Sequence, residues 1–396
     1  MRPKARLLIA QRARSSLAVQ AGRAFDRKGN LCVVTVLIGV LPGSPLWSPL
    51  LPYDPIPSHP QLLAVVGARA CLEVELRDVL RTRRSETARG WVVEHQRAPD
   101  IWTELSGLYV SEEAASAWIA EQGQKYLASE RHRRAAVIRR NNVHLSGRGS
   151  TAMIFAHGFG CDQQMWRFVA PQFEEDFKVV LFDHVGCGRS DPKAYSSERY
   201  ASLSGYASDL TEIGEVLGLR DAVLVAHSVS AMIAVLASVA APKLFGRLVL
   251  IGPSARYIDD VGYVGGFSEK RIGELLQFLE NHYVEWSATM APAIMGNPEH
   301  PHLAQELTDS FCRMDPAIAR EFARVTFTSD SRADLPLVTR PSLILQCSED
   351  AIAPVEAGAY VHGAIPGSTL AVLKATGHCP HLSAPSEVVS AIRAFA

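Results

Sequence analysis

Three side chains that could act together, a serine, a carboxylate and a histidine, each follow a short apolar segment in the C-terminal half of the chain. They are Ser228, Asp350 and His378. A serine hydroxyl becomes an effective nucleophile when a histidine takes its proton and an acid fixes the tautomer of that histidine. The chain order serine, acid, histidine is typical of triads built on a parallel α/β sheet. The sequence therefore predicts acyl-transfer chemistry at one edge of such a sheet.

The residues around the serine, 223–237, form an apolar strand, a sharp turn at Ser228 and an apolar helix. This layout is typical of a nucleophile elbow, whose usual pattern is Gly-x-Ser-x-Gly. Here the flanking residues are Ala226 and Ser230. Strand and helix backbones nearly touch at such a turn, so small residues are needed there. We expect the elbow to form, but the extra atoms of Ser230 could crowd the nucleophile and slow turnover.

Each member of the predicted triad has a neighbour of the same chemical type. Glu349 precedes Asp350, His381 follows His378, and Ser230 lies two residues beyond the nucleophile. Taken singly, each residue reads as an ordinary turn acid or loop histidine. The shared order and the placement of all three residues after predicted strands favour the triad.

The negative charge that develops on a carbonyl oxygen during acyl transfer needs backbone donors. One predicted donor is the N–H of Val229, the residue after the nucleophile. The second is expected from the loop 157–160, with Phe159 the best candidate. Glycines at 158 and 160 let this backbone approach a substrate closely.

Two other patterns are rejected. Gly186-Cys-Gly188 resembles the start of a dinucleotide-binding fingerprint, but Asp191 replaces its third glycine. The segment 378–381 has metal-ligand residue types, but Pro380 and the lack of further ligands argue against a metal site. We therefore expect neither a metal nor an organic cofactor.

From about residue 136, short apolar strands alternate with helices, which predicts a mostly parallel sheet covered on both faces. The expected strands are 151–156, 178–183, 223–227, 247–252, 341–347 and 369–374. The insertion at about 255–335 has no clear strands and should cap the carboxyl edge of the sheet. Its amphipathic helices are expected near 268–281, 283–294, 302–313 and 316–326.

A small α+β region is predicted before this domain, which spans 136–396. Residues 1–60 are basic and rich in proline, and the apolar run 31–41 reads as a buried strand, with a signal peptide as the alternative. Residues 61–135 are predicted to form a β-β-α module and a linker. The module has strands at 89–96 and 101–110 and a helix at 114–127. Its basic end, 131–140, is expected to be a solvated linker rather than a site for an acidic partner.

Length and composition limit the classes of function. With 396 residues, 47% of them apolar and 20% charged, the chain fits a globular protein of two domains. Residues 1–140 carry 21 Lys and Arg against 13 Asp and Glu, whereas residues 141–396 carry 19 against 28. The acidic C-terminal part argues against nucleic-acid binding. No apolar run is long enough to span a membrane. Seven cysteines without CxxC spacing favour reduced thiols and a cytoplasmic protein.

Five segments carry a resemblance to a known family. They are 157–166, 182–191, 226–230, 343–350 and 377–383. They look like those of the RsbQ-type α/β-hydrolases, which comprise a bacterial energy-stress regulator and the plant karrikin and strigolactone receptors. The resemblance runs from about Val137 to the end of the chain.

This resemblance implies an α/β-hydrolase fold with a cap of four helices and the triad named above. It also implies an apolar pocket with Phe159 and Trp286 in its wall. Members of the family hydrolyse small esters or lactones slowly, and several act as ligand sensors. The bacterial regulator works with a PAS-domain phosphatase. We therefore expect a serine hydrolase of the carboxylic-ester type with a signalling or stress-related role. The alternative is a sensor whose output is a protein contact and whose hydrolysis is incidental.

Overall fold

The computed structural model describes residues 19–25, 31–37, 80–85, 91–98, 101–105 and 111–396. The chain divides into two compact units, residues 1–65 and 66–396. In the first unit, β1 (Val19–Phe25) pairs antiparallel with β2 (Leu31–Leu37). The strand expected in the apolar run 31–41 is thus present as β2. The proline-rich segment 42–60 lies outside the described residues.

In the second unit, the first described elements are a three-stranded antiparallel sheet and a long helix. The strands are β3 (Leu80–Arg84), β4 (Trp91–Ala98) and β5 (Ile101–Glu104), and the helix is α2 (Glu112–Arg140). Strands β4 and β5 correspond to predicted strands, whereas β3 was not expected. Its residues, Leu-Arg-Thr-Arg-Arg, lack an apolar alternation that would have indicated a strand.

Helix α2 continues through 131–140, where the sequence suggested a linker. Its start is capped by Ser111, whose hydroxyl accepts the N–H of Ala114 at 3.2 Å. Its basic end meets acidic residues of the same chain. Arg133 lies 2.6 Å from Glu215, and Arg140 lies 2.7 Å from Glu212. These contacts with a helix far along the chain explain why the basic run is ordered.

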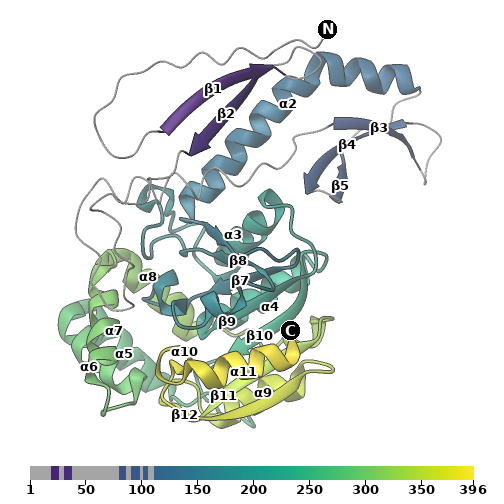
Figure 1. Ribbon diagram of the computed structural model, residues 1–396. Helices are drawn as coiled ribbons and strands as arrows, with labels where there is room; N and C mark the ends of the chain where they lie inside the picture. The colour runs from purple at the N-terminus through teal and green to yellow at the C-terminus, as the bar shows by residue number, and fades with distance from the viewer. Residues whose placement is uncertain (1–18, 26–30, 38–79, 86–90, 99–100, 106–110) are drawn as a thin grey trace. The chain divides into compact units, whose positions relative to one another are not determined.

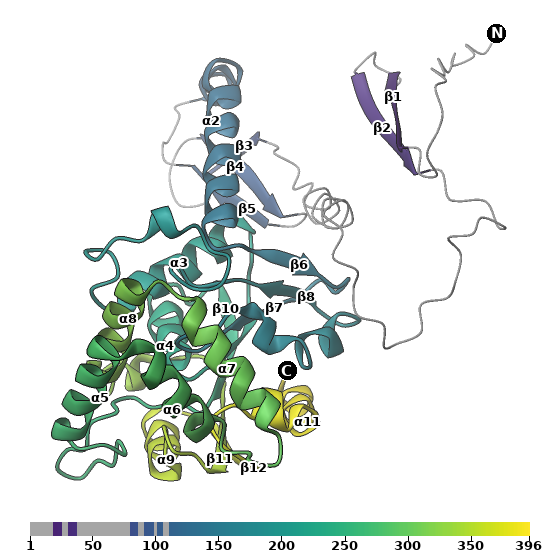
Figure 2. The same ribbon diagram turned by 90° about the vertical axis from the view of Figure 1, so that its left-hand side faces the viewer.

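A seven-stranded sheet forms the centre of the second unit, in the order β12-β11-β10-β9-β7-β8-β6. Figure 2 shows β6 and β12 at opposite ends of this sheet. Only β6 runs antiparallel to its neighbour, so the predicted mostly parallel sheet is confirmed. The strands are β6 (His144–Ser146), β7 (Ala152–Ala156), β8 (Lys178–Leu181), β9 (Ala222–His227), β10 (Phe245–Ile251), β11 (Ser342–Glu349) and β12 (Thr369–Thr376).

Side chains of the central strand β9 alternate between two cores. Leu224 and Ala226 pack in the core that also contains residues of α3 (Leu203–Val216) and α4 (Val229–Ala240). Val223 and Val225 pack in the core on the other face, with α11 (Pro385–Phe395). Figure 2 shows α4 and α11 on opposite sides of the sheet. Both faces are therefore covered, which explains why the strands are apolar at nearly every position.

The insertion between β10 and β11 forms the four-helix cap expected from the sequence (Figure 1). Its helices are α5 (Glu269–Asn281), α6 (Tyr283–Met295), α7 (Pro301–Arg313) and α8 (Pro316–Thr328). Each helix buries one apolar face, and Trp286, Phe311 and Phe322 are among the buried side chains. No helix in the described part of the chain has both the length and the apolar character needed to cross a membrane.

Candidate active site

The turn between β9 and α4 holds Ser228 in a backbone conformation that serine rarely adopts. Its φ is 58° and its ψ is −127°. A non-glycine residue with positive φ is strained, and such strain is common at catalytic turns. The turn is held by the Ser228 N–H, which donates to the carbonyl of Ile251 at 2.9 Å. As a result, the serine is presented at the carboxyl edge of the sheet, as the elbow pattern requires.

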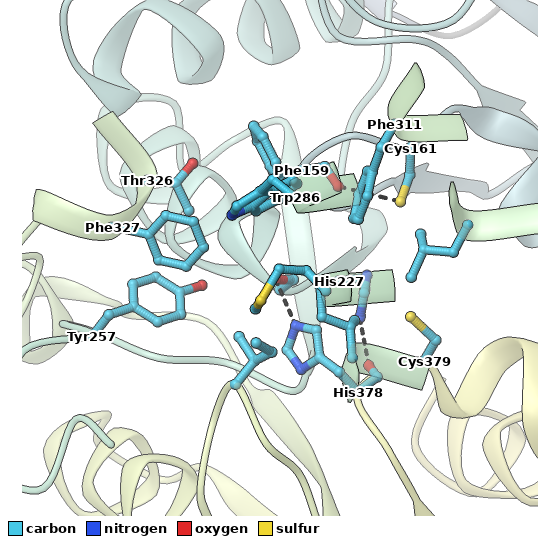
Figure 3. Close-up of a pocket in the computed structure, with 15 residues that line it drawn as sticks. Phe159, Cys161, His227, Tyr257, Trp286, Phe311, Thr326, Phe327, His378 and Cys379 are labelled. Atoms are coloured by element: carbon cyan, nitrogen blue, oxygen red, sulfur yellow. Dashed lines mark hydrogen bonds between the residues drawn. The ribbon is translucent and has the colours of Figure 1, made fainter. Parts of the chain in front are cut away.

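The structure brings Ser228, His378 and Asp350 into one hydrogen-bonded chain. His378 Nε2 lies 2.7 Å from Ser228 Oγ, and His378 Nδ1 lies 2.7 Å from Asp350 Oδ2. An ionised carboxylate only accepts hydrogen bonds, so the bond to Asp350 places the proton of His378 on Nδ1. Nε2 is then free to accept the serine proton. Figure 3 shows His378 among the residues that line the cavity.

The neighbouring residues of the same types are not part of this chain. Glu349 is exposed. His381 is fully buried, and its ring nitrogens have no hydrogen-bond partner in the described structure. Ser230 Oγ lies 2.5 Å from the carbonyl oxygen of His157 and 2.7 Å from His184 Nε2. The Ser230 hydroxyl is thus engaged by these two groups, and Ser230 is not among the residues that line the cavity at Ser228.

Two backbone N–H groups near Ser228 are available to a ligand. Val229 is the first residue of α4, where N–H groups lack intrahelical acceptors. Phe159 lies in the loop after β7. A β-carbon placed on Gly158 would lie 3.2 Å from Ser228 Cβ, so this loop runs directly against the nucleophile. Within the described residues, neither the Val229 nor the Phe159 N–H donates to a protein acceptor. The arrangement suits an oxyanion.

Next to Ser228 lies a mostly apolar cavity between the sheet edge and the cap (Figure 3). The rings of Phe159 and Trp286 are 6.2 Å apart, edge to face, and Trp286 is 5.3 Å from Phe311. Both residues predicted for the pocket therefore line it. The lining comprises Phe159, Cys161, His227, Ser228, Tyr257, Trp286, Met290, Ile294, Leu307, Phe311, Thr326, Phe327, Ile352, His378 and Cys379. Sequence reasoning missed most of these residues; the apolar faces of the cap helices were the only signal for them.

Four polar atoms of residues that line the cavity have no hydrogen-bond partner of good geometry in the described structure. One is His227 Nδ1, and the other three are Tyr257 Oη, Trp286 Nε1 and Thr326 Oγ1. Burial raises the pKa of Tyr257, which keeps its hydroxyl protonated. Buried polar groups are normally paired, so these three call for partners from outside the protein chain.

One further group of side chains has metal-ligand types. The ligand atoms of His227, Cys379 and His381 lie within 4.8 Å of one another. However, burial raises the pKa of the Cys379 thiol, and metals bind the thiolate. His227 Nε2 is also engaged, at 2.7 Å from the carbonyl oxygen of His378. These three side chains therefore fit a packing role beneath the site better than they fit a metal centre.

Comparisons with known proteins agree with this architecture. Karrikin insensitive 2 receptor CA of Petunia hybrida is 37% identical over 250 residues, which cover 63% of this chain and 93% of that protein. Strigolactone esterase D14 of Arabidopsis thaliana is 36% identical over 253 residues, 64% of this chain and 94% of its own. The structure of a hydrolase from Oleispira antarctica has 39% identity and a TM-score of 0.65. It covers 66% of this chain and 96% of that one.

The matched part of the chain contains the whole predicted triad and the cap. Residues 153–391 match the profile of the alpha/beta hydrolase family. This range starts at β7, next to the Phe159 loop, and extends past His378. The chain therefore belongs to the alpha/beta hydrolase family.

Proposed function

We propose that this protein is a serine hydrolase of the carboxylic-ester type that acts on a small ester or lactone. The observation that carries the proposal is the hydrogen-bonded chain from Asp350 through His378 to Ser228, at the wall of an apolar cavity. The names of relatives such as Strigolactone esterase D14 support the same class of reaction.

In the proposed reaction, Ser228 Oγ attacks the substrate carbonyl carbon while His378 Nε2 takes its proton. The N–H groups of Val229 and Phe159 hold the oxyanion. The tetrahedral intermediate collapses to an acyl-enzyme, and the proton on His378 passes to the leaving alkoxide. For a lactone, that alcohol stays attached to the acyl group. A water molecule then attacks the carbonyl carbon of the acyl-enzyme while His378 takes its proton. The second tetrahedral intermediate collapses to the free acid, and His378 returns the proton to Ser228 Oγ.

The cavity supports a substrate class as well as a reaction. Its aromatic and aliphatic lining favours a small, mostly apolar molecule. The unpaired polar atoms of Tyr257, Trp286 and Thr326 favour a substrate with a further hydrogen-bonding oxygen beside the reacting carbonyl. Trp286 Nε1 only donates, so an acceptor oxygen suits it. A lactone with a second carbonyl or ether oxygen meets both conditions.

A second candidate function is ligand sensing with a protein contact as output. The observation that favours it is the similarity to relatives named as receptors, such as Karrikin insensitive 2 receptor CA. Under this proposal the protein is a cytoplasmic regulator of the RsbQ type with a role in a stress response. Its partner would be a protein such as a PAS-domain phosphatase, and slow hydrolysis would be incidental.

The two functions are separated by turnover and by binding. The full chain and Ser228→Ala would be assayed with p-nitrophenyl acetate and with a set of small lactones. A hydrolase is expected to turn over repeatedly, and Ser228→Ala should lose at least about 10³-fold in kcat. The control is Ser390→Ala, which alters an exposed serine in α11. Near-normal turnover by Ser228→Ala would contradict the proposed nucleophile. Ligand-dependent thermal shifts without turnover would favour the sensor.

A further inference from the structure

Ser230 departs from the usual elbow pattern, and its hydroxyl joins two elements that approach Ser228. It lies in the first turn of α4, and its Oγ is 2.5 Å from the carbonyl oxygen of His157. A carbonyl only accepts, so the serine hydroxyl donates here. The same oxygen is 2.7 Å from His184 Nε2, which must then be the donor. All three residues have no exposed surface.

The hydrogen-bond partners of His157 and His184 determine which ring nitrogen of each histidine carries the proton. The backbone N–H of His184 donates to His157 Nε2 at 3.0 Å, so the proton of His157 is on Nδ1. His157 Nδ1 in turn donates to the carbonyl oxygen of Gly158 at 2.8 Å. Burial lowers the pKa of both histidines, which agrees with neutral rings in these tautomers. A closed set of bonds therefore links Ser230, His184 and His157.

This set fixes the backbone that leads to Phe159. The carbonyl of His157 is held by Ser230, and the carbonyl of Gly158 is held by His157 Nδ1 and, at 3.3 Å, by the N–H of Cys161. A trans peptide is planar, with its C=O and N–H pointing in opposite directions. Holding the Gly158 oxygen therefore sets the direction of the Phe159 N–H.

We propose that Ser230 is a positioning residue that aligns the oxyanion-binding Phe159 N–H through His157. This inference rests on the proposed hydrolase function and adds a residue to its machinery. A glycine at this position would leave the His157 carbonyl and the His184 Nε2–H without their shared partner. Ser230 thus supplies hydrogen bonds that the usual elbow glycine cannot make.

The test compares Ser230→Gly and Ser230→Ala with wild type on p-nitrophenyl acetate. Both variants are expected to lose roughly tenfold to a hundredfold in kcat, with KM changed less than about threefold, because the oxyanion forms only in the transition state. A trifluoromethyl ketone forms a hemiketal oxyanion with Ser228, so its inhibition constant should rise by a similar factor. The matched control is Ser238→Ala in the same helix, whose buried hydroxyl donates to Val235 O at 2.8 Å. Its kcat and inhibition constant should stay as in wild type, whatever the change in its melting temperature.

The outcomes separate this inference from the function on which it rests. Turnover that depends on Ser228 but is unchanged or raised in both Ser230 variants overturns the positioning role alone. Parallel losses in the Ser238→Ala control, or failure of both Ser230 variants to fold, also overturn it, because the role is then structural. Absence of Ser228-dependent turnover in wild type removes both proposals together.

Discussion

Asp350 holds His378 with one carboxylate oxygen while the protein backbone holds the other. Oδ2 lies 2.7 Å from His378 Nδ1, and Oδ1 accepts the N–H groups of Ile352 at 2.8 Å and Ala353 at 3.0 Å. The side chain of Asp350 has no exposed surface. The carboxylate therefore cannot turn without losing backbone hydrogen bonds, and the imidazole orientation is fixed by β11 and the turn that follows it.

This relationship predicts the effect of Asp350→Asn. The amide oxygen of Asn would take the two backbone N–H groups, which turns the NH₂ group towards His378 Nδ1. Histidine would then carry its proton on Nε2 and could not accept from Ser228. We expect kcat for p-nitrophenyl acetate to fall by about 10³–10⁴-fold, with a small change in KM. Equal kcat values for Asp350→Asn and wild type would contradict the assignment of Asp350 as the acid of the triad. Glu349→Gln, at the exposed neighbour, is the control and should have normal kcat.

The close approach of the oxyanion loop predicts the effect of Gly158→Ala. A β-carbon there would lie 2.7 Å from His227 Nδ1 and 3.2 Å from Ser228 Cβ, so the loop must move away from the nucleophile. Loss of one oxyanion donor lowers turnover by about 10²–10³-fold, and we expect kcat to fall by about 10²-fold. Gly273→Ala on α5 is the matched control, because no atom lies within 4 Å of its β-carbon. It should leave kcat unchanged. Normal kcat in Gly158→Ala would argue against Phe159 as a donor.

The unpaired hydroxyl of Thr326 predicts opposite effects on stability and on substrate binding. Thr326→Val keeps the shape of the side chain and removes a buried hydroxyl that has no partner in the described structure. The free energy of unfolding should stay the same or rise by about 1 kcal/mol. KM should rise about three- to tenfold for a lactone with a second oxygen acceptor, and stay unchanged for p-nitrophenyl acetate.

Urea unfolding and initial-rate kinetics measure both effects of this variant. Thr308→Val on α7 is its control, because the Thr308 hydroxyl donates to Ala304 O at 3.0 Å and does not line the cavity. Equal KM values of Thr326→Val and wild type for every lactone would contradict a role of this hydroxyl in binding.

The sheet and the placement of the triad candidates could be predicted from sequence for a physical reason. Strands that are buried on both faces leave continuous apolar runs, and parallel strands end at one edge of the sheet. Residues that follow such runs, here Ser228, Asp350 and His378, must meet there. Strand β6 (His144–Ser146) has only three residues at the sheet edge, and a segment this short has no readable periodicity.

The features that could not be predicted from the sequence depend on contacts between distant parts of the chain. Amphipathic patterns predict that each cap helix buries one face, but not that Tyr257, Phe311 and Phe327 share a cavity with Ser228. The role of Ser230 depends on His157 and His184, which come from two other strand ends. Likewise, Arg140 reads as a linker residue until α3 places Asp209 and Glu212 within ion-pair distance.

Four buried histidines predict a loss of stability in acid. Burial lowers the pKa of His157, His184, His227 and His381, the last from 6.5 to about 3. In the unfolded chain, His381 takes up a proton near pH 6.5, whereas in the folded chain it stays neutral down to about pH 3. Its contribution to stability is therefore complete above pH 6.5 and is lost progressively as the pH falls towards 3. His381 gives a slope of about 1.4 kcal/mol per pH unit in this range.

His381→Leu tests this prediction, because it removes one of the four groups. Urea unfolding at pH 7, 6, 5 and 4 should give a free energy of unfolding that falls with acid less steeply than in wild type, by about 1.4 kcal/mol per pH unit. The control is His302→Gln, at an exposed position in the first turn of α7, which should keep the wild-type slope. A His381→Leu slope equal to that of wild type would mean that His381 takes up its proton equally in both states. Its burial beside Trp166, at 4.6 Å between ring centroids, would then not exclude the charged form.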